Sequence, residues 1–93
     1  MIRSFKHKLA ETLFDGKCPK GFPPDLLRVA RRKLEAVNAA QRLEDLRIPP
    51  GNRLEALAAN RAGQFSIRVN DQWRICFAWS DEGAWDVEIV DYH

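Results

Sequence analysis

The sequence predicts a single α+β domain, in which helices from the first half of the chain cover one face of an antiparallel sheet formed by the second half. Three observations support this prediction. Apolar residues recur at helical spacing in the first half, they alternate with polar residues in the second half, and short polar segments separate the alternating runs. A chain of 93 residues corresponds to one domain, residues 1–93, near the lower limit for unaided folding.

The first half contains the predicted helices. A first helix is expected between residues 5 and 16, where three apolar residues recur at helical spacing before a glycine. A stronger helix is predicted over residues 24–37, because a Pro-Asp pair opens it and its apolar residues form one stripe. A short third helix is expected within residues 39–47, ended by "IPPGN". Short strands are expected at residues 2–5 and 52–57.

The second half contains a predicted β-meander. Residues 64–69, 73–79 and 85–89 alternate between apolar and polar side chains, and every apolar residue of the alternation has an odd number. The three tryptophans follow this parity and are therefore expected in the core. The odd face of the sheet should lie under the helices, and the even face should be free.

The lengths of the two hairpin loops follow from the same parity. A three-residue loop at 70–72 keeps apolar residues opposite each other, whereas a two-residue loop would pair an apolar residue with an arginine. The same reasoning predicts a three-residue loop at 81–83. In this register Arg68 lies opposite Arg74 on the even face, and Arg74 lies opposite Val90.

The final run, "VEIVDYH", places three side chains capable of proton transfer at the end of the last strand. Asp91, Tyr92 and His93 would finish beside Arg68 and Arg74, a combination suited to cleaving an RNA phosphodiester. An arginine could stabilise the phosphorane, while His93 acts as base or acid. Asp91 could act as the base or orient His93, and Tyr92 could stack on a base. Alternatively, these residues are an incidental strand end and the arginines pair with acids.

Charge and composition narrow the functional classes. The net charge is +2, with +5 in residues 1–50 and −3 in residues 51–93, and the second part has only arginine as its cation. The two cysteines lack metal-ligand or redox spacing, and neither a signal peptide nor a membrane span is evident. A cytoplasmic protein is therefore expected. A DNA-binding autorepressor is disfavoured, because no helix-turn-helix with a basic recognition helix is found.

Three stretches, "MIRSFKHK", "NRAGQFSIRVNDQWRICFAW" and "VEIVDYH", together resemble the HigB branch of the RelE-type toxins. The resemblance implies a RelE-like fold and the toxin role in a bacterial type II toxin–antitoxin pair. It further implies an mRNA endonuclease that acts within the translating ribosome and requires no metal or cofactor. The implied partners are the ribosome, mRNA and a HigA-like antitoxin that binds DNA. Operator DNA would be bound only through the antitoxin complex, and no membrane is involved.

The resemblance also assigns roles to residues. It implies catalytic roles for Asp91, Tyr92, His93 and Arg74, with Arg74 holding the scissile phosphate. Arg61 matches a basic position in the loop before the central strand, where RNA approaches. Further RNA-binding candidates are Arg68, which shares a face with Arg74, and Arg53.

One segment departs from the family pattern. Well-characterised relatives have a histidine and a lysine where this chain has Glu55 and Ala58. A site that lacks one charge-stabilising donor can lose about 10²–10³ in rate. We therefore expect a slower or milder toxin, or one in which Arg53 or Arg61 substitutes. The alternative is a non-catalytic module of the same fold that binds the ribosome or the antitoxin.

Overall fold

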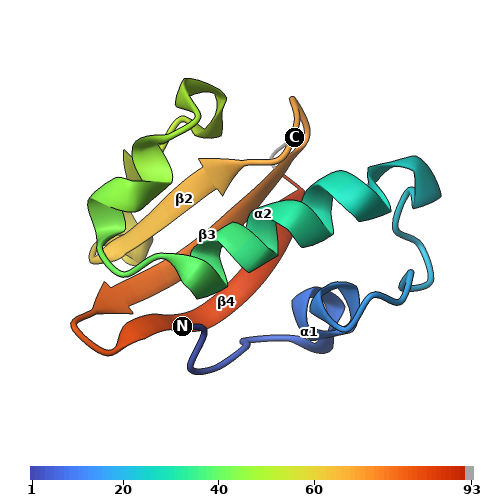
Figure 1. Ribbon diagram of the computed structural model, residues 1–93, viewed down its shortest axis with the longest axis horizontal. Coiled ribbons are helices and arrows are strands. Elements are labelled where there is room, and N and C mark those ends of the chain that lie inside the picture. The colour runs from blue at the N-terminus through green and yellow to red at the C-terminus, as the bar shows by residue number, and fades with distance from the viewer. Residues whose placement is uncertain (92–93) are drawn as a thin grey trace.

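The computed structural model describes residues 1–91, which form a four-stranded antiparallel sheet with two α-helices packed on it (Figure 1). The strands lie side by side in chain order, as β1 (Glu55–Ala56), β2 (Gln64–Arg68), β3 (Trp73–Ser80) and β4 (Gly83–Asp91). The predicted α+β architecture with a C-terminal meander is confirmed.

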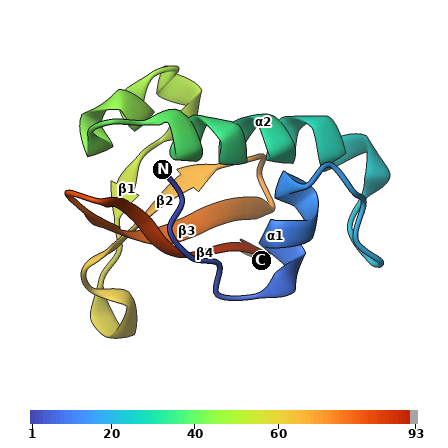
Figure 2. The ribbon, with the colours of Figure 1, turned by 60° about the horizontal axis from the view of Figure 1, so that its bottom comes forward.

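Both α-helices lie on the same side of the sheet as predicted (Figure 2). The first, α1, spans Lys8–Phe14, and the second, α2, spans Leu27–Ala39 after a 3-10 turn at Pro24–Leu26. The expected third helix is a short 3-10 segment, Leu43–Arg47. Its brevity follows from the proline pair nearby, because proline cannot supply the N–H that a continuing helix needs.

The core lies between α2 and the odd face of the sheet. Ala30, Leu34 and Val37 of α2 are fully buried at the spacing of one helical face. They form one apolar cluster with the odd-numbered sheet residues Ile67, Ile75, Phe77 and Val87. Truncating a side chain such as Leu34 to alanine would cost about 2–5 kcal/mol. This cluster fixes the sheet against α2 and thereby positions the opposite face.

The hairpin between β2 and β3 has the predicted register. Arg68 lies opposite Arg74, and Ile67 lies opposite Ile75. The Val69 N–H donates to the carbonyl of Trp73 at 2.9 Å, which closes the three-residue loop. Parity alone was sufficient here because no residue is inserted in either strand.

The hairpin between β3 and β4 differs from the prediction. Ser80 lies opposite Gly83, so the loop has two residues rather than three. The register then shifts, because Asp86 and the next residue together oppose a single β3 residue in a β-bulge. Asp86 has a positive φ of 53°. The bulge reverses the parity of Trp85, which lies opposite Ala78 on the even face instead of in the predicted core.

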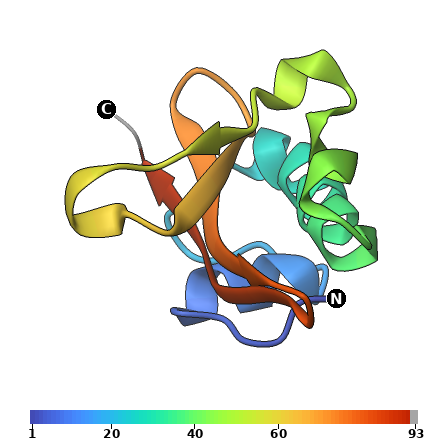
Figure 3. The same cartoon turned by 90° about the vertical axis from the view of Figure 1, so that its left-hand side faces the viewer.

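The even face is not free at its centre, in contrast to the prediction. Ser66, Arg74, Cys76 and Glu88 are all buried there. The first part of the segment that connects α2 to β2 stays beside α2, where Leu46 joins the core, whereas the loop directly before β2 extends to the opposite side of the sheet, as Figures 2 and 3 show. Sequence parity assigned the side chains of β2 and β3 to the correct faces, but it does not reveal which connecting segment covers a face.

The N-terminal segment runs parallel to β4 and covers that edge of the sheet. Ile2 and Phe5 form isolated bridges with Ala84 and Val87. The expected strand at residues 2–5 is therefore reduced to two bridges. These contacts bring Lys6 to the even face, where the candidate site lies.

Candidate functional site

Arg74 is the best-anchored cation of the even face. Only 9% of the residue is exposed, although it is charged. Its Nε donates to the Oγ of Ser66 at 2.9 Å, and its Nη2 donates to the carbonyl oxygen of Arg53 at 2.9 Å. Two fixed acceptors hold the planar guanidinium in one orientation, which is the preorganisation that a phosphate-binding group requires.

Arg53 contributes its backbone to this site. It has a left-handed conformation with a φ of 47°, directly after a 3-10 turn at Pro50–Asn52. The fully buried Asn52 anchors that turn, because its Nδ2 donates to the carbonyl oxygens of Leu46 at 3.1 Å and Ile48 at 3.3 Å. The Oδ1 of Asn52 also accepts a hydrogen bond from Lys33 on α2. This network sets the position of the carbonyl that orients Arg74.

Glu55 places a carboxylate next to the anchored arginine. It lies opposite Ser66 in the β1–β2 ladder, and its Oε1 is 4.0 Å from the Nη2 of Arg74. The Glu55 side chain is 59% exposed, so solvent weakens this ion pair. Glu55 therefore places a negative charge beside the guanidinium, at the position where the resemblance leads us to expect a histidine.

A second charged cluster lies beside Arg74 on the even face. The Nη1 of Arg61 is 3.0 Å from Glu88 Oε2 and 3.2 Å from Gln64 Oε1. The Nζ of Lys6 is 3.4 Å from the same Glu88 oxygen. Arg61 comes from the loop before β2, Lys6 from the N-terminal segment and Glu88 from β4. Three separate parts of the chain therefore meet at one carboxylate.

Cys76 lies at the centre of this polar face and is fully buried. Burial raises the pKa of its thiol above the usual value, and the nearby Glu88 charge raises that pKa further. Arg61, Arg74 and Lys6 act in the opposite direction but do not reverse the shift. The thiol is therefore protonated at neutral pH, a state that makes it a poor nucleophile.

The remaining sequence-predicted residues lie near the end of the sheet. Arg68 faces Arg74 across the β2–β3 ladder and forms an ion pair with Asp71 in the adjacent loop. Asp91 lies opposite Trp73, so its side chain leaves the sheet on the helix side, whereas that of Arg74 leaves on the other. The Oδ2 of Asp91 accepts a hydrogen bond from Gln72 at 3.0 Å. The two other predicted catalytic residues, Tyr92 and His93, lie outside the described residues.

The structure adds three residues that the sequence reasoning missed. Ser66 and Glu88 have even numbers within strands, so parity already placed them on the face of Arg74. Glu88 lies opposite Cys76, which is also the pairing that the predicted Arg74–Val90 register gives, because the bulge lies between this pair and the β3–β4 loop. No sequence signal pointed to Lys6, which reaches the site only through the pairing of the N-terminal segment with β4.

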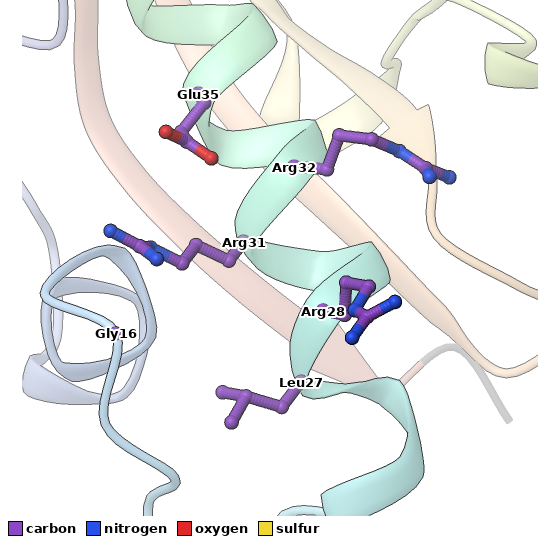
Figure 4. Close-up of a pocket in the computed structure, with 6 residues that line it drawn as sticks. All are labelled: Gly16, Leu27, Arg28, Arg31, Arg32 and Glu35. Carbon is purple, nitrogen blue, oxygen red and sulfur yellow. The ribbon is translucent and has the colours of Figure 1, made fainter.

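A separate basic surface lies on the helix side. A depression of about 410 Å³ is lined by Gly16, Leu27, Arg28, Arg31, Arg32 and Glu35 (Figure 4). Arg31 extends toward Gly16 at the end of α1, while Arg28 and Arg32 extend to the other side of α2. These arginines lie off the apolar stripe of α2, which consists of Ala30, Leu34 and Val37.

Residues 1–91 contain no metal-ligand cluster. Within that range, no group of three or more His, Cys, Asp and Glu side chains is arranged to hold a metal ion. Over the same part of the chain, none of the helices has the length and apolar character needed to cross a membrane.

Comparison with known proteins places the sequence in a family. Residues 3–93 match the family model described as the RelE-like toxin of the type II toxin–antitoxin system HigB. The chain is 46% identical over 82 residues to a protein named Toxin HigB-1 from Vibrio cholerae, covering 87% of this chain and 86% of that protein. It is 33% identical to a protein named Endoribonuclease HigB from Proteus vulgaris, over the full length of both. The chain therefore belongs to the HigB family of RelE-like toxins of type II toxin–antitoxin systems.

Proposed function

We propose that the protein is an endoribonuclease toxin that cleaves translated mRNA on the ribosome and thereby inhibits translation. The name of the Proteus vulgaris relative, Endoribonuclease HigB, supports RNA cleavage. The observation that carries the proposal is the doubly anchored guanidinium of Arg74, which shares a face with Arg61 and Arg68. Such a face can bind and neutralise a phosphodiester.

The proposed reaction is attack by the ribose 2′-hydroxyl on the adjacent phosphorus, with departure of the 5′-oxygen. Arg74 stabilises the charge that develops on the phosphorane, a role that requires no metal ion in this mechanism. Tyr92 and His93 provide the proton transfers at the leaving oxygen and the 2′-hydroxyl. Because Asp91 leaves the sheet on the side away from Arg74, we assign it to orienting His93.

The low net charge of the protein supports the proposal that its activity depends on the ribosome. A net charge of +2 gives weak attraction for free RNA, so the ribosome would supply both affinity and a held, extended mRNA. Arg53, Arg61 and Arg68 would contact RNA on the even face. The basic depression on α2 is a candidate surface for ribosomal RNA or for the antitoxin. A toxin that acts on the ribosome would work in the cytoplasm.

The family implies a cognate antitoxin as partner. We propose that this antitoxin is HigA-like and binds DNA, so that operator DNA is bound only through the complex. Neutralisation of the toxin would then be reversed when the antitoxin is removed. An antitoxin that covered the even face would block the groups proposed to bind RNA there.

The proposed function is tested by inducing the protein in bacteria without antitoxin and mapping new mRNA 5′ ends across the transcriptome. We expect ends in phase with codons, because the ribosome presents mRNA in codon steps. A variant lacking Tyr92 and His93 should produce none. New ends that persist in this variant, or equal growth arrest without any new ends, would contradict the proposal.

The second candidate is a module of the same fold that binds the ribosome or the antitoxin without cleaving. One observation favours it: the Glu55 carboxylate lies 4.0 Å from Arg74 and opposes its charge. The Ala58→Lys and Glu55→His variants separate the two candidates, since they restore the residue types of the relatives. A cleaving toxin that lacks cationic support should become faster. An unchanged rate in the Ala58→Lys variant would rule out the missing lysine as the cause of slow cleavage.

A further inference from the structure

Glu88 is a buried carboxylate with two cations that come from distant parts of the chain. The residue is only 5% exposed, and its Oε2 faces Arg61 Nη1 at 3.0 Å and Lys6 Nζ at 3.4 Å. A buried charge is costly unless it is paired, so these two cations are what make the burial of Glu88 possible. Conversely, one fixed carboxylate holds two flexible cationic side chains close together.

The two cations remain accessible although their partner is buried. The side chain of Lys6 is 45% exposed and that of Arg61 is 31% exposed, compared with 6% for Glu88. An anion in solution can therefore reach the cations without reaching the carboxylate. Among the described residues, one buried carboxylate thus lies against two partly exposed cations.

The cluster lies beside Arg74 on the same face. Glu88 lies opposite Cys76, two residues along β3 from Arg74, so Glu88 and Arg74 are diagonal neighbours about 7–8 Å apart. Arg61, Glu88, Arg74 and Lys6 all lie near enough for their charges to act on the pKa of the Cys76 thiol. A polymer with repeating phosphates could contact Arg74 and this cluster at once.

We infer that Glu88 is a positioning residue, which holds Lys6 and Arg61 together as a two-cation subsite for an RNA phosphate next to the phosphate at Arg74. The inference rests on the proposed function in taking RNA as the ligand. Lys6 would provide cationic support in a chain that has alanine at position 58, where relatives have lysine. Its place is set by the backbone, because the Lys6 N–H donates to the Val87 carbonyl at 3.0 Å.

The test measures binding of the purified protein to a short single-stranded RNA with 2′-O-methyl groups, which cannot be cleaved by 2′-hydroxyl attack. The binding constant is measured at a series of salt concentrations, beginning at low ionic strength. Each phosphate contact of a single strand contributes about −0.7 to the slope of log K against log salt concentration. Lys6→Ala and Arg61→Gln should each lower the magnitude of that slope by about 0.7 and weaken binding about five-fold at 0.1 M salt.

Glu88→Gln gives the decisive result, because two explanations predict opposite changes in the affinity for RNA. Removing an acid raises the net charge, so simple electrostatics predicts tighter RNA binding. Loss of positioning predicts binding weakened about five-fold and a shallower slope. The matched control is Glu82→Gln, which makes the same charge change in the exposed β3–β4 loop and should not weaken binding. Lys8→Ala, at the exposed start of α1, is the control for Lys6→Ala.

The effect of Glu88→Gln should disappear in a background that already lacks both cations. If Glu88→Gln prevents folding, as a thermal unfolding curve would show, the Lys6 and Arg61 variants still test the subsite. Tighter binding by folded Glu88→Gln, or unchanged slopes for Lys6→Ala and Arg61→Gln, would overturn the inference. No binding by the unmodified protein at low salt would also overturn it. If the salt slopes change as expected but the protein cleaves no mRNA in cells, only the proposed function is rejected.

Discussion

The Nε of Arg74 donates to the Oγ of Ser66 at 2.9 Å across the β2–β3 ladder, in the buried centre of the even face. The opposite end of the guanidinium is held by the Arg53 carbonyl. A lysine has a single nitrogen and cannot make both contacts. Arg74→Lys should therefore lower the cleavage rate on programmed ribosomes about 10²–10³-fold, as expected for loss of a charge-stabilising donor.

Ser66→Ala should have a smaller effect of the same kind, about ten-fold, because Arg74 retains its second anchor. Arg47→Lys is the matched control, since Arg47 is exposed in a 3-10 segment away from this face, and its rate should not change. A normal rate for Arg74→Lys would show that orientation of the guanidinium is not required.

Cys76 should resist alkylation in the folded protein, whereas Cys18 should react. Cys18 is exposed and Cys76 is fully buried, with burial raising the pKa of its thiol. Iodoacetamide at neutral pH should therefore add one group to the native protein and two groups after unfolding, as measured by mass spectrometry. Rapid labelling of Cys76 under native conditions would mean that the even face opens readily.

Asn52 should link the stability of the domain to its activity. Replacement by alanine leaves the carbonyls of Leu46 and Ile48 without this donor and removes the acceptor of Lys33. We expect the free energy of unfolding to fall by about 2–4 kcal/mol, measured by urea denaturation. Cleavage should slow as well, because the turn that carries the Arg53 carbonyl loosens. Asn60→Ala, at an exposed position, should change neither quantity.

Gly83 should not tolerate alanine. Its φ is 131°, and a Cβ atom at this position would lie 2.1 Å from the carbonyl oxygen of Met1. The N-terminal segment would have to move, which breaks the 2.9 Å hydrogen bond from the Ala84 N–H to Met1. We expect a loss of about 1–3 kcal/mol in unfolding free energy. Gly51→Ala is the control, because it has open space around it and should be accepted.

Asp45 should make stability depend on pH in the acid range. Hydrogen bonds from the backbone N–H groups of Arg42 and Gln41 lower the pKa of Asp45 below the usual 3.8. A carboxylate with a depressed folded-state pKa stabilises the protein above its unfolded pKa and loses that contribution as pH falls through the folded value. Asp45→Asn should therefore lower the thermal unfolding temperature at neutral pH.

The effect of the same substitution should shrink as pH falls, because the stabilising contribution is lost as the carboxyl of the folded state becomes protonated. The neighbouring Glu44→Gln serves as the control. A difference between the Asp45→Asn variant and the parent that stays constant from neutral pH to acid would contradict the hydrogen-bond explanation.

The two hairpins differ in how well the alternation of apolar and polar residues predicts their register. For β2 and β3, alternation gave the register, the loop length and the pairing of Arg68 with Arg74 correctly. For β4 the same rule was wrong about the loop and about Trp85, because the bulge at Asp86 inserts a residue. A bulge of this kind depends on the local backbone conformation. Asp86 adopts its positive φ although it is not a glycine, so the sequence contains no signal for the bulge.

The sequence by itself determined the α+β class, the helix side of the sheet, the face on which Arg74 lies and, through its resemblance, the toxin family. These properties depend on periodicity and motifs, which are local along the chain. Only the tertiary structure decided that Ser66 and the Arg53 carbonyl hold Arg74, and that Glu88 gathers Lys6 and Arg61. Lys6 and Glu88 are 82 residues apart, and their contact depends on how the N-terminal segment pairs with β4, which no local pattern encodes.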